Sequence, residues 1–409
     1  MKKNIKGGIN AAKGFCSGGF RAGIKPNSTK DDMALVYSEK PCVIAGTFTT
    51  NKVKAAPVKW DHRVVTESAF AQAIVVNTGI ANASTGAQGY ACCEEMAAEV
   101  GTVMNVPAES VIVASTGVIG KQLPMEIIKA GIRELPKKLG TDEEHALAAA
   151  TAIMTTDTRP KQIACSFEIG GQTVTMGGMC KGAGMIHPNM ATMLCFITTD
   201  CMIRKELLQK ALSDVVRDTF NMISVDGDTS TNDSCMVLAN GMAGNPIIDK
   251  EDESYRTFYE ALFYVLRDLS KKIAGDGEGC TKLLEVSVKG AFSDQDARLM
   301  AKAVACSNLT KCAIYGRDAN WGRIICAMGY SGGEFDPEKV DISFTSEYGT
   351  IDVCRDGTPL DFNEEVATKI LSSEHVIAVC DCKQGPYEAT AYGCDLTHEY
   401  VNINADYRS

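Results

Sequence analysis

The sequence predicts a mixed α/β (α+β) protein built from layered β-sheets and helices. Short apolar runs rich in β-branched residues alternate along the chain with longer stretches of helical periodicity. Glycine-rich turns separate many of these segments. The chain has 409 residues, of which 45% are hydrophobic and 22% charged. It is therefore long enough to bury a large core without disulfides or a structural metal.

The first 120 residues contain apolar runs that end at turn residues, a pattern typical of strands. Strands are predicted at Val43–Thr49, Ala73–Asn77 and Val111–Ser115. A helix is expected over Cys92–Met104, between the second and third strands. Helical periodicity returns over Pro124–Leu139, where Pro124 and Glu126 suit a first turn.

A further helix is predicted over Asp142–Ile153, with Thr141 as its N-cap and Glu144 three residues on. The segment Ile163–Met179 alternates around Gly170-Gly171, which predicts a β-hairpin.

A glycine-rich loop, Lys181–Met190, leads into an apolar strand predicted at Ala191–Asp200. The second half repeats the mixture of elements. Helices are predicted at Lys205–Phe220, Glu253–Ile273 and Asp294–Ala305. Strands are predicted at Leu283–Val288, Cys312–Tyr315, Ile324–Tyr330, Val340–Thr345, Thr350–Cys354, Val376–Asp381 and Tyr387–Tyr392.

Charge and composition exclude several classes of partner. The net charge of −10 argues against nucleic acid as the main partner, although a local cationic pocket can still bind an anionic small molecule. No stretch approaches the roughly 18 apolar residues of a membrane span, and the first residues lack an apolar signal region. We therefore expect a soluble, cytoplasmic protein.

The 17 cysteines are scattered and include no C-x-x-C pair, so structural zinc is not predicted. They are expected to be reduced thiols that are buried as small apolar groups. The acidic turns at 226–229 and 275–279 lack the full calcium-loop pattern. We predict no metal site and no bound cofactor.

The loop before Thr192 is the most unusual stretch of the sequence. A threonine hydroxyl is a poor nucleophile unless a base lies beside it. Cleavage of the Ala191–Thr192 bond would free an α-amino group with a pKa of about 7.7 to 8.0, which could take the hydroxyl proton. From spacing alone, Thr192 fits an ordinary residue at the start of a buried strand equally well.

Two further turns carry groups suited to acyl chemistry. In Ser115–Gly120, a hydroxyl and backbone N–H groups at a strand end could hold an oxyanion. In Gly275–Gly279, Glu278 could hold a substrate ammonium, although a glycine is expected there in any case after a helix. The chain contains no G-x-S-x-G or H-E-x-x-H motif and no P-loop.

Together these segments resemble the glutamate N-acetyltransferase (ornithine acetyltransferase) family, over essentially the whole chain. KGAGMIHPNMATML (181–194) is the most specific of them. The others are GTFTTNKVKAAPV (46–58), ASTGVIG (114–120), MTTDTRPK (154–161), SVDGDTSTND (224–233), GDGEG (275–279), GRDANWGRI (316–324) and NADYRS (404–409).

The resemblance implies a layered fold of the DmpA/ornithine-acetyltransferase type in a self-cleaving, N-terminal-nucleophile-like enzyme. Cleavage between Ala191 and Thr192 would give an α chain, 1–191, and a β chain, 192–409. These chains would stay together, as a heterotetramer of two α and two β chains. Thr192 would carry acetyl from N2-acetyl-L-ornithine to L-glutamate by a ping-pong mechanism, in arginine biosynthesis.

The resemblance also implies a role for each matching residue. Thr116 and Gly117 align with the oxyanion positions of the family. The substrate-binding positions align with Thr155, Lys181, Thr192, Glu278, Asn404 and Ser409.

The sequence leaves three questions open. It does not decide whether acetyl-CoA serves as a second donor. An aminopeptidase or amidase of related fold would share the nucleophile but pass the acyl group to water. A non-catalytic scaffold would keep the fold as one uncleaved chain.

Overall fold

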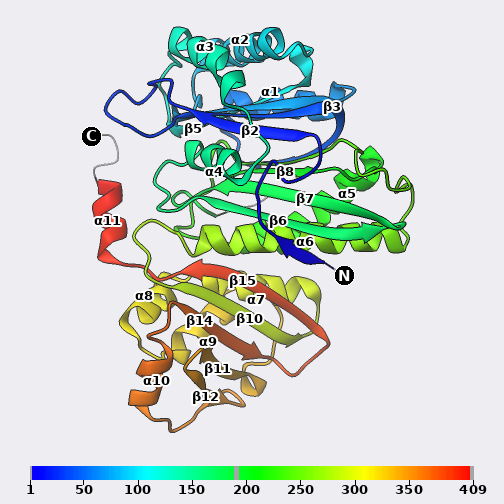
Figure 1. Cartoon of the computed structure of the whole chain (residues 1–409). Coiled ribbons are helices and arrows are strands. Elements are labelled where there is room, and N and C mark those ends of the chain that lie inside the picture. Colours follow the sequence, from blue (N-terminus) through cyan, green and yellow to red (C-terminus); the bar gives the residue numbers. More distant parts are fainter. Residues whose placement is uncertain (1, 188–192, 406–409) are drawn as a thin grey trace. The chain divides into compact units, whose positions relative to one another are not determined.

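The computed structural model describes residues 2–187 and 193–405, which fall into two units (Figure 1). The larger unit comprises Met1–Gly182, Pro188–Arg217 and Thr229–Leu269. Within the described residues its strands form one sheet of nine, in the order β1-β6-β7-β8-β9-β3-β4-β5, with β2 paired to β3. The strands are β1 (Lys3–Ile5), β2 (Phe15–Phe20), β3 (Met33–Phe48), β4 (Ala71–Ile80), β5 (Val111–Val118), β6 (Lys161–Ile169), β7 (Gln172–Lys181), β8 (Leu194–Thr199) and β9 (Ser234–Ala239).

Helices cover this sheet and also fill a fold within it. Helix α4 contacts β2 and β3 as well as β6 and β7, while α1 and α2 pack on β5 (Figure 1). Strand β4 is buried along most of its length, which explains its nearly continuous apolar sequence. The helices are α1 (Ala56–Glu67), α2 (Gly86–Met104), α3 (Met125–Glu134), α4 (Glu143–Ala152), α5 (Lys205–Asp218) and α6 (Glu253–Ala274).

Strand β3 belongs to two parts of the sheet. Its first half pairs with β2 and β4, and its second half pairs with β9. A register shift between Tyr37 and Cys42 separates the halves. The sequence explains the break, because Glu39, Lys40 and Pro41 are exposed there and proline has no N–H to donate to a ladder.

The smaller unit comprises Ala183–His187, Asp218–Asp228 and Ser270–Ser409. Its described strands form a six-stranded sheet, in the order β13-β12-β11-β14-β10-β15, on which α7 packs. The strands are β10 (Leu283–Ala291), β11 (Asp341–Ser346), β12 (Gly349–Arg355), β13 (Thr358–Pro359), β14 (His375–Asp381) and β15 (Tyr387–Cys394). The helices are α7 (Asp294–Cys306), α8 (Asn308–Gly316), α9 (Trp321–Gly329), α10 (Glu364–Ile370) and α11 (His398–Ala405).

The predicted mixed α/β class is confirmed, and most of the predicted elements are present with shifted ends. The hairpin around Gly170-Gly171 is β6 and β7. The strand expected over 191–200 is β8, whose described part begins at Leu194. Helix α2 begins at Gly86, before the predicted Cys92.

Two predicted strands are wrong, since Cys312–Tyr315 lies in helix α8 and most of Ile324–Tyr330 lies in α9. The side chains of Ser307 and Asn320 cap these helices by accepting a backbone N–H three residues later. In α9 the buried apolar side chains recur three and four positions apart, which is helical spacing. Short apolar runs do not distinguish a strand from a buried helix.

The predicted N-cap of α4 is wrong by one residue. Asp142, not Thr141, caps the helix, and its carboxylate accepts the N–H of His145 at 3.0 Å. The reason is that a carboxylate also interacts favourably with the positive end of the helix dipole.

The cysteines and the helices agree with the expected class of protein. All 17 cysteines lie within the described residues as free thiols, and most are buried. Across residues 2–187 and 193–405, no helix is both long and apolar enough to cross a membrane.

Asp61 is a buried carboxylate in α1 with a predictable effect on stability. Its Oδ1 accepts the N–H of Val113 at 2.9 Å, and its Oδ2 has no partner among the described residues. Burial raises the pKa of Asp61 well above its ordinary value, although the Val113 N–H opposes the shift. The folded state therefore holds a proton that the unfolded chain releases above about pH 4.

We expect stability to fall as pH rises above that point, by up to about 1.4 kcal/mol per pH unit from this group. Asp61→Asn should remove this slope, so its melting temperature should gain on that of the wild type between pH 4 and pH 8. Glu67→Gln, at the exposed end of the same helix, is the matched control. Parallel curves for wild type and Asp61→Asn would contradict a protonated Asp61.

Candidate active site

Thr116 and Gly117 lie near the end of β5, beside β4. The two strands are parallel, with Thr116 opposite Thr78 and Gly117 opposite Gly79. Gly117 has a φ of +132°, and a Cβ atom there would lie 2.3 Å from the carbonyl carbon of Gly79. Only glycine fits this close approach of two backbones. The strand pairing thus holds a hydroxyl and an adjacent N–H at the end of a buried strand, as an oxyanion site requires.

Lys181 reaches Thr116 from the other part of the sheet. It is the last residue of β7, and its Nζ lies 3.4 Å from the Thr116 Oγ1. In the antiparallel pairing of β7 with β8, Lys181 is opposite Leu194. Because Leu194 follows Thr192 by two residues, the segment that carries Thr192 enters the sheet beside Lys181.

Asp157 joins this cluster, and sequence reasoning did not single it out. Its Oδ1 accepts the N–H of Gly182 at 2.7 Å and the Lys161 Nζ at 2.6 Å. Its Oδ2 accepts the N–H of Thr155 at 3.1 Å and lies 4.0 Å from the Lys181 Nζ. One carboxylate therefore fixes the backbone of two predicted substrate-binding segments. The signal was present in MTTDTRPK, where an acid and a lysine stand four residues apart.

Glu278 and Asn404 meet in the smaller unit. The Asn404 amide of α11 donates to the Glu278 Oε2 at 2.8 Å, and the Glu278 N–H donates to the Ala183 carbonyl at 2.9 Å. A Cβ atom on Gly184 would lie 2.3 Å from the Glu278 carboxylate. The glycine at 184 therefore lets the carboxylate lie directly against the loop that precedes Thr192.

Asp226 holds the next turn of that loop. Met185 has a φ of +55°, a left-handed conformation that a residue with a side chain adopts only under constraint. The Asp226 carboxylate accepts the N–H of Met185 at 2.6 Å and that of Ile186 at 2.9 Å. This acidic turn, considered above for metal, therefore binds backbone instead. Among the described residues, no group of three or more acidic, histidine or cysteine side chains could hold a metal ion.

His187 ends the described part of the loop as a neutral group. Its Nδ1 lies 3.1 Å from the Ser224 Oγ. Burial lowers the pKa of His187 to about 4, and Lys302 lowers it further against the opposing charge of Asp228. Ala191, Thr192 and Ser409 lie outside the described residues.

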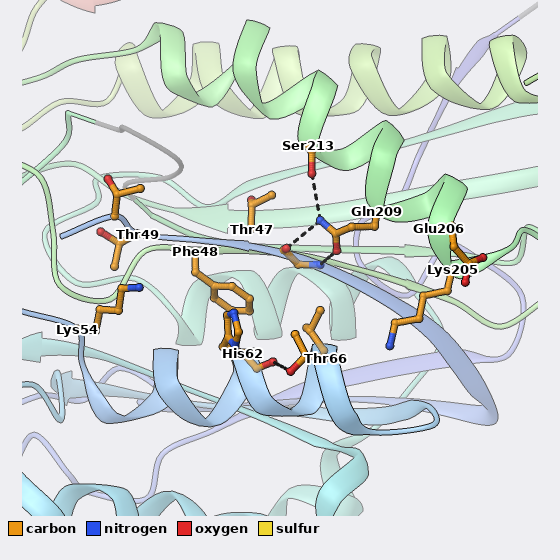
Figure 2. A pocket seen from close by; sticks show the side chains of 13 residues that line it. Thr47, Phe48, Thr49, Lys54, His62, Thr66, Lys205, Glu206, Gln209 and Ser213 are labelled. Atoms are coloured by element: carbon orange, nitrogen blue, oxygen red, sulfur yellow. Dashed lines mark hydrogen bonds between the residues drawn. The ribbon is translucent and has the colours of Figure 1, made fainter. Parts of the chain in front are cut away.

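A cavity of about 620 Å³ lies elsewhere in the larger unit, between α1 and α5 (Figure 2). The Gln209 side chain on α5 bonds both the N–H and the carbonyl of Gly46 in β3, so it closes a strand edge there. The rings of Phe48 and His62 lie together on the α1 side, 5.7 Å apart (Figure 2). The lining comprises Gly46, Thr47, Phe48, Thr49, Thr50, Lys54, His62, Val65, Thr66, Lys205, Glu206, Gln209 and Ser213.

None of the predicted site residues lines this cavity. Its lining mixes two lysines, Lys54 and Lys205, with the carboxylate of Glu206, and this set does not select one ligand charge. The cavity nevertheless approaches the candidate site through the sheet, because Ser234 of β9 pairs with Phe48 on one side and Leu194 on the other.

Comparison with known proteins gives a family. The profile of the ArgJ family matches residues 16–409. A relative from Clostridium acetobutylicum, named arginine biosynthesis bifunctional protein ArgJ 1, is 52% identical over 395 residues, covering 96% of this chain and 95% of its own. A relative from Thermotoga neapolitana, named arginine biosynthesis bifunctional protein ArgJ, is 49% identical over 398 residues, covering 97% of this chain and 99% of its own.

Two solved structures are also similar in sequence. One is an arginine biosynthesis bifunctional protein ArgJ from Bacillus halodurans, with 48% identity, 51% of this chain and 97% of that chain covered, and a TM-score of 0.49. The other is an ornithine acetyltransferase complexed with ornithine from Mycobacterium tuberculosis, with 39% identity, 47% and 100% covered, and a TM-score of 0.44.

Proposed function

The chain belongs to the ArgJ family, and on this premise we propose that it transfers acetyl from N2-acetyl-L-ornithine to L-glutamate through an acetyl ester on Thr192. The match over residues 16–409 carries the proposal. The placement of Lys181 beside Thr116, at the start of the strand that follows Thr192, supports it.

The first half-reaction forms the ester. The Thr192 Oγ attacks the acetyl carbonyl while the α-amine of the same residue takes the hydroxyl proton. The amide C–N bond then breaks, and ornithine leaves with that proton on its amine. Thr116 and Gly117 donate hydrogen bonds to the alkoxide that forms between these steps.

The second half-reaction regenerates the enzyme. The amine of glutamate attacks the acetyl ester, the C–O bond breaks, and the Thr192 hydroxyl is restored as N-acetyl-L-glutamate leaves. Both substrates are α-amino acids, so one set of groups can serve both steps. In this assignment Lys181 binds the substrate carboxylate and Glu278 binds an ammonium, while Thr155, Asn404 and Ser409 complete the site.

The pairing of strands supports the proposal that the chains stay together after cleavage at Ala191–Thr192. Strand β8 would belong to the β chain, but it pairs with β7 of the α chain. Strand β9 of the β chain likewise pairs with β3 of the α chain. Cleavage would therefore leave one continuous sheet made from both chains. The cytoplasmic location and the assembly of two α and two β chains stay predictions.

Ornithine release with and without glutamate tests the transfer. With N2-acetyl-L-ornithine alone, we expect a burst of about one ornithine per active site, after which release stops because the ester has no acceptor. Added glutamate should restart steady turnover. Equal steady release in both conditions would identify a hydrolase, and no release from a single uncleaved chain would identify a scaffold.

The same assay with acetyl-CoA in place of acetylornithine tests the second donor. The relatives are named bifunctional proteins, which favours this additional activity. Formation of N-acetylglutamate from acetyl-CoA and glutamate would establish it, and its absence would limit the protein to acetyl exchange between the two amino acids.

A further inference from the structure

Asp157 is a buried carboxylate that lies near two buried lysines in the larger unit. The Lys161 Nζ is 2.6 Å from the Asp157 Oδ1, and the Lys181 Nζ is 4.0 Å from its Oδ2. The side chains of Asp157 and Lys161 are 0% and 1% exposed, and that of Lys181 is 11% exposed. These three side chains therefore sum to one positive charge in a place where water screens little.

The distances decide which lysine is the main partner of the carboxylate. Only Lys161 is close enough for a short, charge-assisted hydrogen bond. Burial alone would raise the pKa of Asp157, but Lys181, Lys161 and the Gly182 N–H together hold it well below its ordinary value. The carboxylate is thus ionised, and its charge needs a cation. Lys25 also faces the cluster, and adds to its positive side.

We propose that Lys161 determines the charge with which the site binds its substrate. By neutralising Asp157, Lys161 prevents this carboxylate from cancelling the charge of Lys181. Lys181 then keeps its attraction for the α-carboxylate of the substrate. Lys161 is therefore a specificity-determining residue that acts through Lys181, and this inference rests on the proposed acetyl transfer.

A second role of Asp157 explains why the site keeps a carboxylate that needs neutralising. Its oxygens accept the N–H groups of Thr155 and Gly182. A neutral asparagine keeps one acceptor oxygen but not both, so the backbone contacts favour the acid. Lys161 lets the acid hold this backbone without weakening the neighbouring cation.

The donor substrate makes the charge effect testable, because N2-acetyl-L-ornithine has a single carboxylate. Its carboxamide has the same shape without that charge. Charge balance predicts that Lys161→Met raises the KM for acetylornithine about tenfold, with kcat little changed. The same variant should bind the carboxamide as the wild type does.

The double variant Asp157→Asn/Lys161→Met separates charge from structure. It removes one charge of each sign, so the cluster regains its net positive charge. We expect its KM for acetylornithine to return to within about threefold of wild type, since replacing both members of a buried ion pair is often nearly neutral. Lys210→Met, which removes a lysine from an exposed ion pair, is the matched control.

A double variant as poor as Lys161→Met, or an equal loss with the carboxamide, would assign Lys161 a purely structural role and overturn the inference. If Lys161→Met does not fold, the comparison of wild type with the double variant decides alone, because charge balance requires similar KM values. A wild-type enzyme that transfers no acetyl would instead overturn the proposed function.

Discussion

Thr192→Ala is expected to remain one chain of 43.8 kDa and to transfer no measurable acetyl. In the proposed mechanism one hydroxyl performs both reactions, since it attacks the preceding carbonyl during cleavage and later carries acetyl. Alanine lacks that hydroxyl, and without cleavage no α-amine is freed to act as base. Removal of a nucleophile that works with its base as a unit costs about 10⁴- to 10⁶-fold in rate.

Denaturing electrophoresis and ornithine release measure the two effects separately. Wild type should give two bands of roughly half size, and mass spectrometry of wild type with acetylornithine alone should find acetyl on the first residue of the β chain. Thr192→Ser keeps a hydroxyl and is the matched control, expected to cleave and to transfer. Cleavage or acetyl transfer by Thr192→Ala would remove this residue from its proposed role.

The sequence predicted the class of fold because its strongest patterns are local. The run in β4 is apolar because the strand is buried on both faces, and the turn at Gly170-Gly171 marks the hairpin of β6 and β7. Helices α8 and α9 were predicted as strands because their apolar runs are short. There the deciding signals were the capping residues Ser307 and Asn320, which look like ordinary turn residues in a sequence.

The composition of the site was less predictable than the fold. Thr116 and Lys181 are separated by 65 residues, and only strand pairing brings their side chains to 3.4 Å. Asp157 and Lys161 stand at the spacing of an ordinary exposed helix pair. In the structure they are instead a buried pair between a loop and the start of β6. Neither proximity nor burial is readable from spacing alone.

The predicted division into chains and the division into units follow different physics. Cleavage at Ala191–Thr192 depends on the chemistry of one peptide bond. The units depend on packing, and Ala183–His187 belongs to the smaller unit although both flanking segments belong to the larger one. A boundary of a cleaved chain therefore need not be a boundary of a folded unit, and the strands on each side of the cut pair with each other.

Thr116→Val is expected to lower kcat by about 10²- to 10³-fold while leaving the fold intact. Lys181 donates to the Thr116 oxygen at 3.4 Å, so the hydroxyl proton is directed elsewhere and can be donated to an alkoxide. Valine has nearly the shape of threonine and suits a strand, but it has no proton to give. The Gly117 N–H would remain, which is why some activity should persist.

Two neighbouring variants isolate the hydroxyl in this experiment. Thr116→Ser keeps the donor and should stay within a few-fold of wild type in kcat. Thr78→Val makes the same exchange at the buried position opposite Thr116 on β4, where the hydroxyl bonds the Asp32 carbonyl at 3.4 Å. It should change stability more than kcat. Steady-state kinetics with acetylornithine and glutamate gives all three values, and a Thr116→Val enzyme as fast as Thr78→Val would leave the alkoxide to the backbone alone.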